Sequence, residues 1–427
     1  MQIRTRTAIT LATACMTLIM QPVIAGAPSA QPEELGLSSA RLERIGELVD
    51  RYIDEGSFSG AVTLVGRNGQ IGHLEAHGLM NVENGTPMDE DGIFRIMSMT
   101  KPVIGVAILM MMEEGKVRVQ DPVSDYIPEW EDMTVAVSLP APTGRGAGPG
   151  RGAGPGPGGG APQYYTVPVE RPVTIRDLLT HTSGVVSGTN SNSANAAVAA
   201  GPRDALADYI PRLGDVPLEF QPGTRWAYSA QAGFDVLSHV VEIAAGMPID
   251  EFLQERLFDP LDMNDTSYIL PEDDPRLVSL YLRTASGFEP RADMPFMNGI
   301  YFSGGGGLVS TASDYAQFAL MLANGGELGG IRILSPRSVE LMGSVFLPDT
   351  AEGRQPGEAY GLSVRVITDS AARNTYLTEG SFGWSGAFGT HFWVDPQNNL
   401  AAVVMTQTSD RQFLGDFENM VMQAIVE

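Results

Sequence analysis

The stretch Ser98-Met99-Thr100-Lys101 and the apolar run that follows it constrain the fold of this chain more than any other feature. The run 102–112 is apolar on nearly every side, which predicts a helix buried in the protein interior. Pro102 suits the first helical turn, where its missing N–H costs little, and Gly115 suits the C-terminal end. Because a buried lysine almost always has a partner, we expect Lys101 to be held by polar groups at the start of this helix.

The spacing of Ser98 and Lys101 predicts a chemical pairing. Residues three apart on a helix lie on the same face, so the lysine amine lies beside the serine hydroxyl. The positive end of the helix dipole lies at the same place. A serine hydroxyl is a weak nucleophile until a neighbouring base takes its proton. The tetrad therefore indicates a nucleophilic serine with a lysine as proton acceptor. Taken without its context, the same tetrad is also compatible with a serine that caps the helix and a lysine that is exposed to solvent.

The N-terminus has the pattern of an export signal. Arg4 and Arg6 precede an apolar stretch, 8–24, and small residues at 23–27 supply cleavage signals. We therefore predict a signal peptide over residues 1–25, a periplasmic or secreted protein, and no stable membrane anchor. Cys15 resembles a lipoprotein acylation site only loosely, so a lipoprotein is disfavoured. Because Cys15 is the only cysteine, a processed chain has no disulfide and no cysteine nucleophile or metal ligand.

Charge and histidine content exclude several classes of partner. The formal net charge is −24, and it becomes −26 if residues 1–25 are removed. Such an acidic chain is a poor partner for nucleic acid or an anionic membrane. The histidines at 73, 77, 181, 239 and 391 include no pair with metal-ligand spacing and a nearby carboxylate. We therefore expect no metal and no organic cofactor, and a small-molecule substrate, while the oligomeric state stays open.

The two ends of the chain predict parts of one antiparallel sheet. An amphipathic helix over 38–55 is followed by two strand-like stretches, 60–65 and 71–78, joined by an Asn-Gly turn. Near the C-terminus, the stretches 391–394 and 400–406 repeat this hairpin pattern and precede a final amphipathic helix. The ends therefore favour an α/β lobe over about 33–95 and 300–427.

The middle of the chain, about 96–299, is mostly helix and loop and predicts an inserted helical lobe within a single domain, 26–427. Residues 140–162 repeat a Gly-Arg-Gly-Ala-Gly-Pro unit. Ordering glycine this dense costs more conformational entropy than its side chains can offset, so we expect a disordered surface loop. A second stretch of small residues, Asn190 to Ala200, also reads as a loop.

Five motifs in order resemble one known superfamily. They are residues 94–101, 174–184, 220–229, 304–311 and 383–386. Together they resemble the serine β-lactamases and penicillin-binding proteins, and most closely the class C-like branch that includes the family VIII carboxylesterases. The resemblance covers about residues 33–425. It implies the β-lactamase-like fold (α/β + α), an antiparallel sheet flanked by helices with an inserted helical lobe.

The resemblance also implies catalytic roles. Ser98 is the nucleophile and Lys101 helps to remove its proton. Tyr228, in Tyr228-Ser229-Ala230, completes the triad. A phenol titrates near ~10 in water, and a neighbouring ammonium lowers that value, so Tyr228 can carry protons. By family position, the backbone N–H groups of Ser98 and Ala387 form the oxyanion hole.

Two positions, 384 and 230, depart from the pattern of the penicillin-recognising members. Trp384 stands where those proteins have a cation, and Ala230 stands where they have an asparagine. With Trp384, Ser385 and Gly386 lining the substrate site, we expect an aromatic wall that suits neutral or apolar acyl groups, and glycines 383 and 386 that allow the backbone to approach the substrate. Residues 383–387 nearly match a Gly-x-Ser-x-Gly elbow, but His391 follows too closely for Ser385 to be that kind of nucleophile.

The sequence therefore predicts a serine hydrolase that cleaves carboxylic esters through an acyl-enzyme on Ser98. Three alternatives stay open. A β-lactamase or D-Ala-D-Ala carboxypeptidase would use the same triad, and an amide hydrolase or transacylase would differ only in substrate or acceptor. A non-catalytic binding protein would keep the scaffold alone. The natural substrate, its acyl length and the role of loop 140–162 are not set by these patterns.

Overall fold

The computed structural model describes residues 27–139, 162–297, 299–347 and 351–427. The predicted signal peptide, 1–25, and nearly all of the glycine-rich loop, 140–162, lie outside the described residues. The predicted boundaries of the two lobes fall within the described part of the chain.

One antiparallel sheet joins the two ends of the chain, as the sequence predicted. Within the described residues it has eight strands in the order β12-β13-β14-β15-β16-β1-β2-β3. Strand β1 pairs with β16 from Val62↔Met405 to Arg67↔Leu400, so an N-terminal and a C-terminal strand are neighbours. The strands of this sheet are β1 (Gly60–Arg67), β2 (Gln70–Asn81), β3 (Thr86–Pro87), β12 (Glu358–Tyr360), β13 (Arg365–Ile367), β14 (Phe382–Ser385), β15 (His391–Asp395) and β16 (Leu400–Met405).

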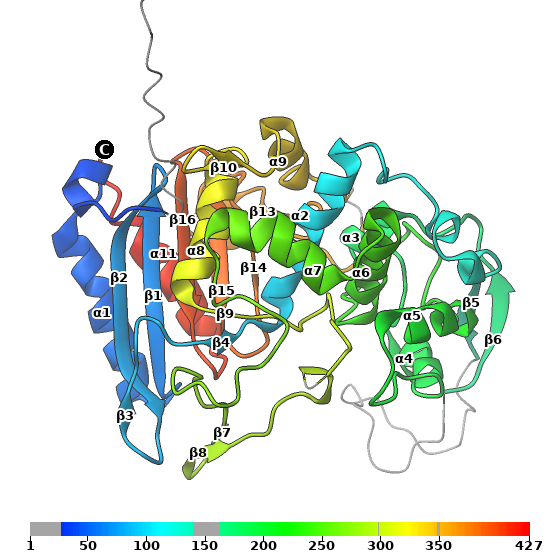
Figure 1. The fold of residues 1–427 in the computed structure, drawn as a ribbon, viewed down its shortest axis with the longest axis horizontal. Helices are drawn as coiled ribbons and strands as arrows, with labels where there is room; N and C mark the ends of the chain where they lie inside the picture. Colours follow the sequence, from blue (N-terminus) through cyan, green and yellow to red (C-terminus); the bar gives the residue numbers. More distant parts are fainter. Residues whose placement is uncertain (1–26, 140–161, 298, 348–350) are drawn as a thin grey trace, which may run out of the picture.

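Helices cover both faces of this sheet. Side chains on β1 alternate between the two faces, as in any strand. Val62 and Leu64 belong to a cluster that includes Phe318 of helix α8, while Val65 belongs to a second cluster that includes Phe417 of helix α11. The C-terminus lies near α1 at one side of the molecule (Figure 1). The helices are α1 (Ser39–Asp54), α2 (Thr100–Glu113), α3 (Ile175–Leu179), α4 (Thr189–Asn195), α5 (Leu206–Tyr209), α6 (Ala232–Ala245), α7 (Ile249–Leu253), α8 (Ala312–Ala323), α9 (Pro336–Met342), α10 (Ser370–Arg373) and α11 (Arg411–Met422).

The helical lobe lies beside the sheet, with α3, α4, α5 and α6 grouped together (Figure 1). Helix α2 is the predicted interior helix, and every residue from Thr100 to Met111 is buried. Helix α4 corrects one expectation, because Thr189–Asn195 is helical where a loop was predicted. A glutamate that the pattern of small residues could not indicate supports this helix: the Ser191 N–H donates to Glu219 Oε2 at 2.9 Å.

Four short strand pairs complete the fold of the described residues. The pairs are β4 (Phe94–Arg95) with β9 (Val309–Ser310), β5 (Thr134–Ser138) with β6 (Tyr164–Pro168), β7 (Tyr281–Thr284) with β8 (Gly287–Pro290), and β10 (Glu327–Leu328) with β11 (Ile331–Arg332). The β4–β9 pair lies nearest to the serine, because it fixes Arg95, which is three residues before Ser98.

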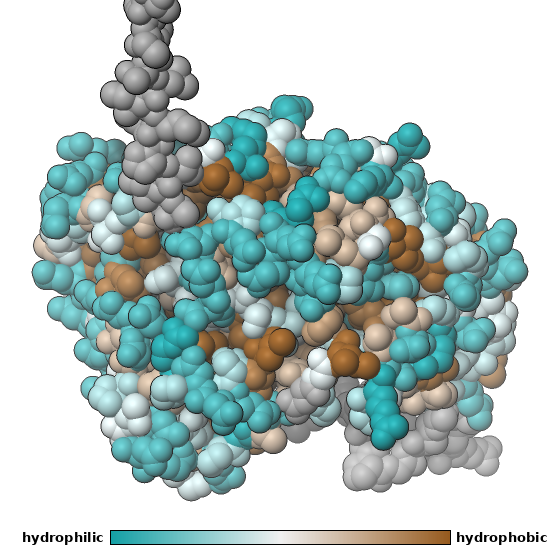
Figure 2. Space-filling view, viewed as in Figure 1, coloured by the Kyte–Doolittle hydropathy of each residue, from teal (hydrophilic) through white to brown (hydrophobic). Residues whose placement is uncertain are grey.

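Hydrophilic residues cover most of the face shown in Figure 2, with small hydrophobic groups set among them. In the described part of the chain, no single helix is long and apolar enough to cross a membrane. Only α6 taken together with the stretch Ile249–Leu261 passes by length and composition, and the two are bent by 78°.

Candidate active site

Ser98 lies in a short 3₁₀ turn, Met97–Met99, directly before α2. From its spacing with Lys101, we expected Ser98 to lie in the first turn of the α-helix. Ser98 lies instead in the 3₁₀ turn directly before that helix, which begins at Thr100. The residue before the serine, Met97, has a φ of 48°, a region that non-glycine residues seldom adopt. Such strain persists only where the surroundings enforce it. Here the Tyr315 hydroxyl donates to the Met99 carbonyl at 2.8 Å and the Ile96 N–H donates to the Leu308 carbonyl at 3.1 Å.

Lys101 is completely buried and fully partnered. Its ammonium donates to Ser98 Oγ at 3.1 Å, to the Ala230 carbonyl at 2.7 Å and to the Gly305 carbonyl at 2.6 Å. An ammonium has three donor hydrogens, so these contacts use all of them. The lysine is therefore aimed at the serine by two backbone carbonyls from different parts of the chain.

Tyr228 reaches the same serine from the helical lobe, although it is 130 residues away in the sequence. Its hydroxyl lies 2.7 Å from Ser98 Oγ, and the Lys101 ammonium lies 5.0 Å from the centre of its ring. Burial of the phenol by itself raises its pKa. The charge of Lys101 and the hydrogen bond with Ser98 outweigh burial, so the pKa of Tyr228 lies below its ordinary value. The structure thus brings together the three residues that the sequence proposed as a catalytic triad.

His181 is a neighbour of this group to which the sequence assigned no role. Its ring stacks on Trp384 with the centroids 5.7 Å apart, and it lies 4.8 Å from the Tyr228 ring. Burial, and then the charge of Lys101, hold the pKa of His181 well below its usual value, so the ring is neutral. The residue belongs to the 174–184 motif, which marked its importance but not its position.

Strand β14 and the loop after it form the opposite side of the site. Ala387 is exposed, and its N–H has no hydrogen-bond acceptor within the described residues, so it is available to a ligand. Gly386 is needed for protein packing. A Cβ there would lie 2.4 Å from the Ile96 carbonyl oxygen. At Gly383 a Cβ would lie 2.1 Å from the Phe392 carbonyl oxygen, so both glycines admit neighbouring protein backbone where we had expected substrate.

One cavity of about 670 Å³ contains nearly all of the predicted site residues. Those that line it are Ser98, Tyr228, Trp384, Ser385, Gly386 and Ala387. An aromatic wall is present, as expected, and includes Trp226, which stacks on Tyr360 at 4.4 Å between ring centres. The aromatic wall is not the whole lining, because the cavity also has five charged side chains, those of Glu358, Arg365, Arg373, Arg411 and Glu418.

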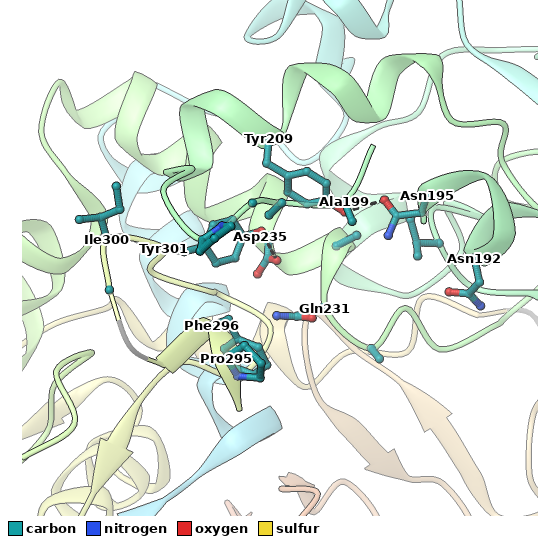
Figure 3. A pocket seen from close by; sticks show the side chains of 17 residues that line it. Asn192, Asn195, Ala199, Tyr209, Gln231, Asp235, Pro295, Phe296, Ile300 and Tyr301 are labelled. Carbon is teal, nitrogen blue, oxygen red and sulfur yellow. Dashed lines mark hydrogen bonds between the residues drawn. The ribbon is translucent and has the colours of Figure 1, made fainter. Parts of the chain in front are cut away.

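A second cavity, of about 590 Å³, is lined by Gln231, Asp235 and Tyr301 among other residues (Figure 3). Asp235 projects into it beside Tyr301, whose hydroxyl donates to Asp235 Oδ2 at 2.6 Å. The same carboxylate accepts from the Gly305 N–H at 3.0 Å. Because the Gly305 carbonyl accepts from Lys101, Asp235 supports the backbone that holds the lysine. Sequence reasoning missed this aspartate, since an isolated Asp inside a helix pattern gives no signal of its partners.

Within the described residues, no group of three or more His, Cys, Asp or Glu side chains is arranged to hold a metal ion.

The fold and this site define a class of protein. An antiparallel sheet built from both chain ends, an inserted helical lobe and a Ser-x-x-Lys helix between them constitute the β-lactamase-like fold. The Beta-lactamase family model matches residues 45–427, and the chain belongs to that family.

Three relatives illustrate the range of the similarity. Protein Rv1367c of Mycobacterium tuberculosis is 32% identical over 370 residues, which cover 83% of this chain and 87% of the relative. Esterase EstB of Burkholderia gladioli is 28% identical over 425 residues, which cover 90% and 95%. Among solved structures, EstCE1, described as a hydrolase with promiscuous acyltransferase activity, superposes with a TM-score of 0.74 at 25% identity and covers 91% of this chain and 99% of its own. The family resemblance and the fold expected from the sequence are thereby confirmed.

Proposed function

We propose that this protein is a serine carboxylesterase that works through an acyl-enzyme on Ser98. The observation that carries the proposal is that Ser98 Oγ contacts both Tyr228, at 2.7 Å, and Lys101, at 3.1 Å, within a cavity. The Lys101 charge lowers the pKa of the Tyr228 phenol, so Tyr228 as a phenolate is a proton acceptor beside Ser98 Oγ. A serine hydroxyl needs such an acceptor to attack a carbonyl. The esterase and hydrolase descriptions of EstB and EstCE1 support the same choice of substrate.

The reaction has two halves. In the first, Ser98 Oγ attacks the ester carbonyl as its proton passes to Tyr228, the carbon–alkoxide bond breaks, and the alkoxide leaves as the alcohol with one proton taken from the site. In the second, the attacking water gives one proton back to the site, the acyl–Ser98 bond breaks to release the acid, and Ser98 recovers its proton from Tyr228. The oxyanion of each tetrahedral intermediate accepts from the N–H groups of Ser98 and Ala387. Each such donor typically lowers the barrier by roughly 3 kcal/mol. Lys101 keeps the local potential positive, which favours both the phenolate and the oxyanion.

Trp384 favours neutral esters over β-lactams. In this site the position beside Tyr228 is occupied by an indole, with its ring centre 5.9 Å from that of the tyrosine. An indole offers one N–H donor and no positive charge to a substrate carboxylate.

Paired initial rates on p-nitrophenyl butyrate and nitrocefin test the proposal, for wild type and Ser98→Ala. We expect ester turnover that disappears with Ser98→Ala and nitrocefin turnover that is slow or absent. If Ser98→Ala retains ester turnover, Ser98 is not the nucleophile. If nitrocefin turnover is fast, the main activity is β-lactam hydrolysis and the esterase proposal is wrong. Ser59→Ala, at a buried serine before β1 and outside this cavity, is the matched control.

A further inference from the structure

A second chain of polar side chains ends in the cavity that contains Ser98. Ser385 on β14 lies directly opposite His391 on β15, and Ser385 Oγ is 2.8 Å from His391 Nδ1. His391 Nε2 is in turn 3.0 Å from Glu418 Oε1 on α11. The sequence analysis rejected Ser385 as the nucleophile of a Gly-x-Ser-x-Gly elbow because His391 follows it too closely in the chain. Cross-strand pairing brings them together, although Ser385 lies at a strand end and not at a strand–helix elbow.

The contacts of His391 indicate which form of the ring the site holds. Burial alone raises the pKa of Glu418, but the hydrogen bond with His391 and the charge of Arg365 lower it to about 2, so the carboxylate is ionised and only accepts. Nδ1 lies 3.1 Å from the Trp384 carbonyl, which also only accepts. A ring with hydrogens on both nitrogens satisfies these contacts. The Ser385 hydroxyl then accepts from Nδ1 and is free to donate into the cavity.

The charges around this histidine come from four neighbouring elements. Glu418, on α11, faces it directly and also accepts from Arg365 of β13 at 2.7 Å. Arg365 lies 3.4 Å from Glu358 of β12, which pairs with Arg373 of α10. The two carboxylates are buried, so a cationic His391 has a fixed counter-ion that does not depend on solvent.

We propose that Ser385, His391 and Glu418 form a second proton relay, which serves the leaving alcohol and the incoming water while Lys101 and Tyr228 serve Ser98. The proposal rests on the proposed function and divides its proton transfers between two groups on opposite sides of one cavity. Ser385 is the residue that contacts the substrate oxygen, and His391 and Glu418 act through it.

The proton balance closes over one turnover. In acylation, Ser98 gives its proton to Tyr228 as the Oγ–carbon bond forms. The carbon–alkoxide bond then breaks, and the alkoxide takes the Ser385 proton while Ser385 takes one from His391. In deacylation, the attacking water gives a proton to Ser385, which passes its own to His391, as the new carbon–oxygen bond forms. The acyl–Ser98 bond then breaks, and Ser98 recovers its proton from Tyr228. One ester and one water become one acid and one alcohol.

The leaving group distinguishes this role from a structural one. An alkoxide is a strong base and needs a proton as it departs, whereas p-nitrophenolate is a weak base and departs without one. The quantity to measure is kcat/KM, which reports acylation, on ethyl butyrate and on p-nitrophenyl butyrate for wild type, His391→Gln and Ser385→Ala. We expect both variants to lose about 10²–10⁴-fold on the ethyl ester, as for the loss of a general acid, and less than about 10-fold on the nitrophenyl ester.

Two variants serve as controls. Ser385→Thr keeps the hydroxyl and is expected to recover most of the ethyl ester activity. His77→Gln alters a histidine that also contacts two carboxylates, Asp50 and Glu75, but lies on β2, three strands from β15 and near the far edge of the sheet. It is expected to leave the ratio of the two rates unchanged.

Three outcomes would overturn the relay. Equal losses on the two esters would mean that His391 and Ser385 only shape the cavity, and no loss on either would mean that they take no part. If His391→Gln does not fold, the Ser385→Ala ratio decides the question alone. If Ser98→Ala forms an acyl-enzyme and Ser385→Ala does not, Ser385 is the nucleophile, and the proposed function is refuted as well. If the relay variants show equal losses or no loss while Ser98→Ala is inactive, the relay is refuted and the proposed function stands.

Discussion

Removing the charge of Glu418 tests the electrostatics of the β13–β15–α11 cluster quantitatively. The carboxylate is buried, accepts from Arg365 and His391, and has its pKa lowered to about 2. An unfolded glutamate titrates near ~4.3, and each unit of difference corresponds to ~1.4 kcal/mol, so ionised Glu418 stabilises the fold by roughly 3 kcal/mol at neutral pH. Breaking a buried ion pair typically costs a similar amount, about 3–5 kcal/mol.

The sign of the pH dependence follows from the lowered pKa. A carboxylate with a folded pKa below its unfolded value stabilises the protein fully above the unfolded pKa, and this contribution is lost as the pH falls through the folded pKa. Glu418→Gln keeps the shape but has no charge at any pH. The difference in unfolding free energy between wild type and variant is therefore expected to be constant above pH ~4.3 and to shrink as the pH falls towards ~2.

Urea unfolding followed by tryptophan fluorescence, repeated from pH ~7 to ~3, measures this difference. Glu47→Gln, on the exposed face of α1, is the control and is expected to change the unfolding free energy by less than about 0.5 kcal/mol. If the difference in unfolding free energy between wild type and Glu418→Gln does not shrink below pH ~4.3, the loss comes from packing and not from charge, and the electrostatic explanation is refuted. The explanation is also refuted if the two proteins have the same unfolding free energy at neutral pH.

The remaining predictions concern the nucleophile and its neighbours. Tyr228→Phe is expected to lower kcat/KM about 10²–10⁴-fold. In the wild type, kcat/KM is expected to rise as the pH increases through the lowered pKa of the phenol, and in the variant this rise is expected to disappear, which pH–rate profiles of the two proteins measure. The unfolding free energy of the variant is expected to change by only about 1 kcal/mol, since one hydrogen bond is lost. Lys101→Met is expected to abolish acyl-enzyme formation, detected by mass spectrometry, and to leave the carbonyls of Ala230 and Gly305 unpaired. Gly386→Ala is expected to lower both the melting temperature and kcat, because its Cβ collides with the Ile96 carbonyl; normal values of both would contradict that collision.

Local patterns were sufficient for several elements, although not for α4, and for one catalytic contact. Helix α2, the hairpin of β1 and β2 and the hairpin of β15 and β16 all follow from periodicity and turn residues, which depend on neighbours within a few positions. The contact of Ser98 with Lys101 is also local, because a helical turn places residues three apart together. For Tyr228, only the family motif pointed to the site, since spacing alone cannot relate residues 130 apart.

The charged side of the cavity was decided by tertiary structure. His391 reaches Ser385 only because β14 and β15 pair in one register, and a shift of one residue would turn its side chain to the other face of the sheet. Glu418 joins them only because α11 packs on the sheet at that point. Asp235 likewise supports Lys101 through a glycine carbonyl far along the chain. The sequence by itself determined the interior helix, the two hairpins at the chain ends, the family and the serine–lysine pair, because these depend on short-range periodicity and motifs. The packing of strand against strand and helix against sheet determined which buried charges face the substrate, because no local pattern records the distance between segments that meet only in the folded chain.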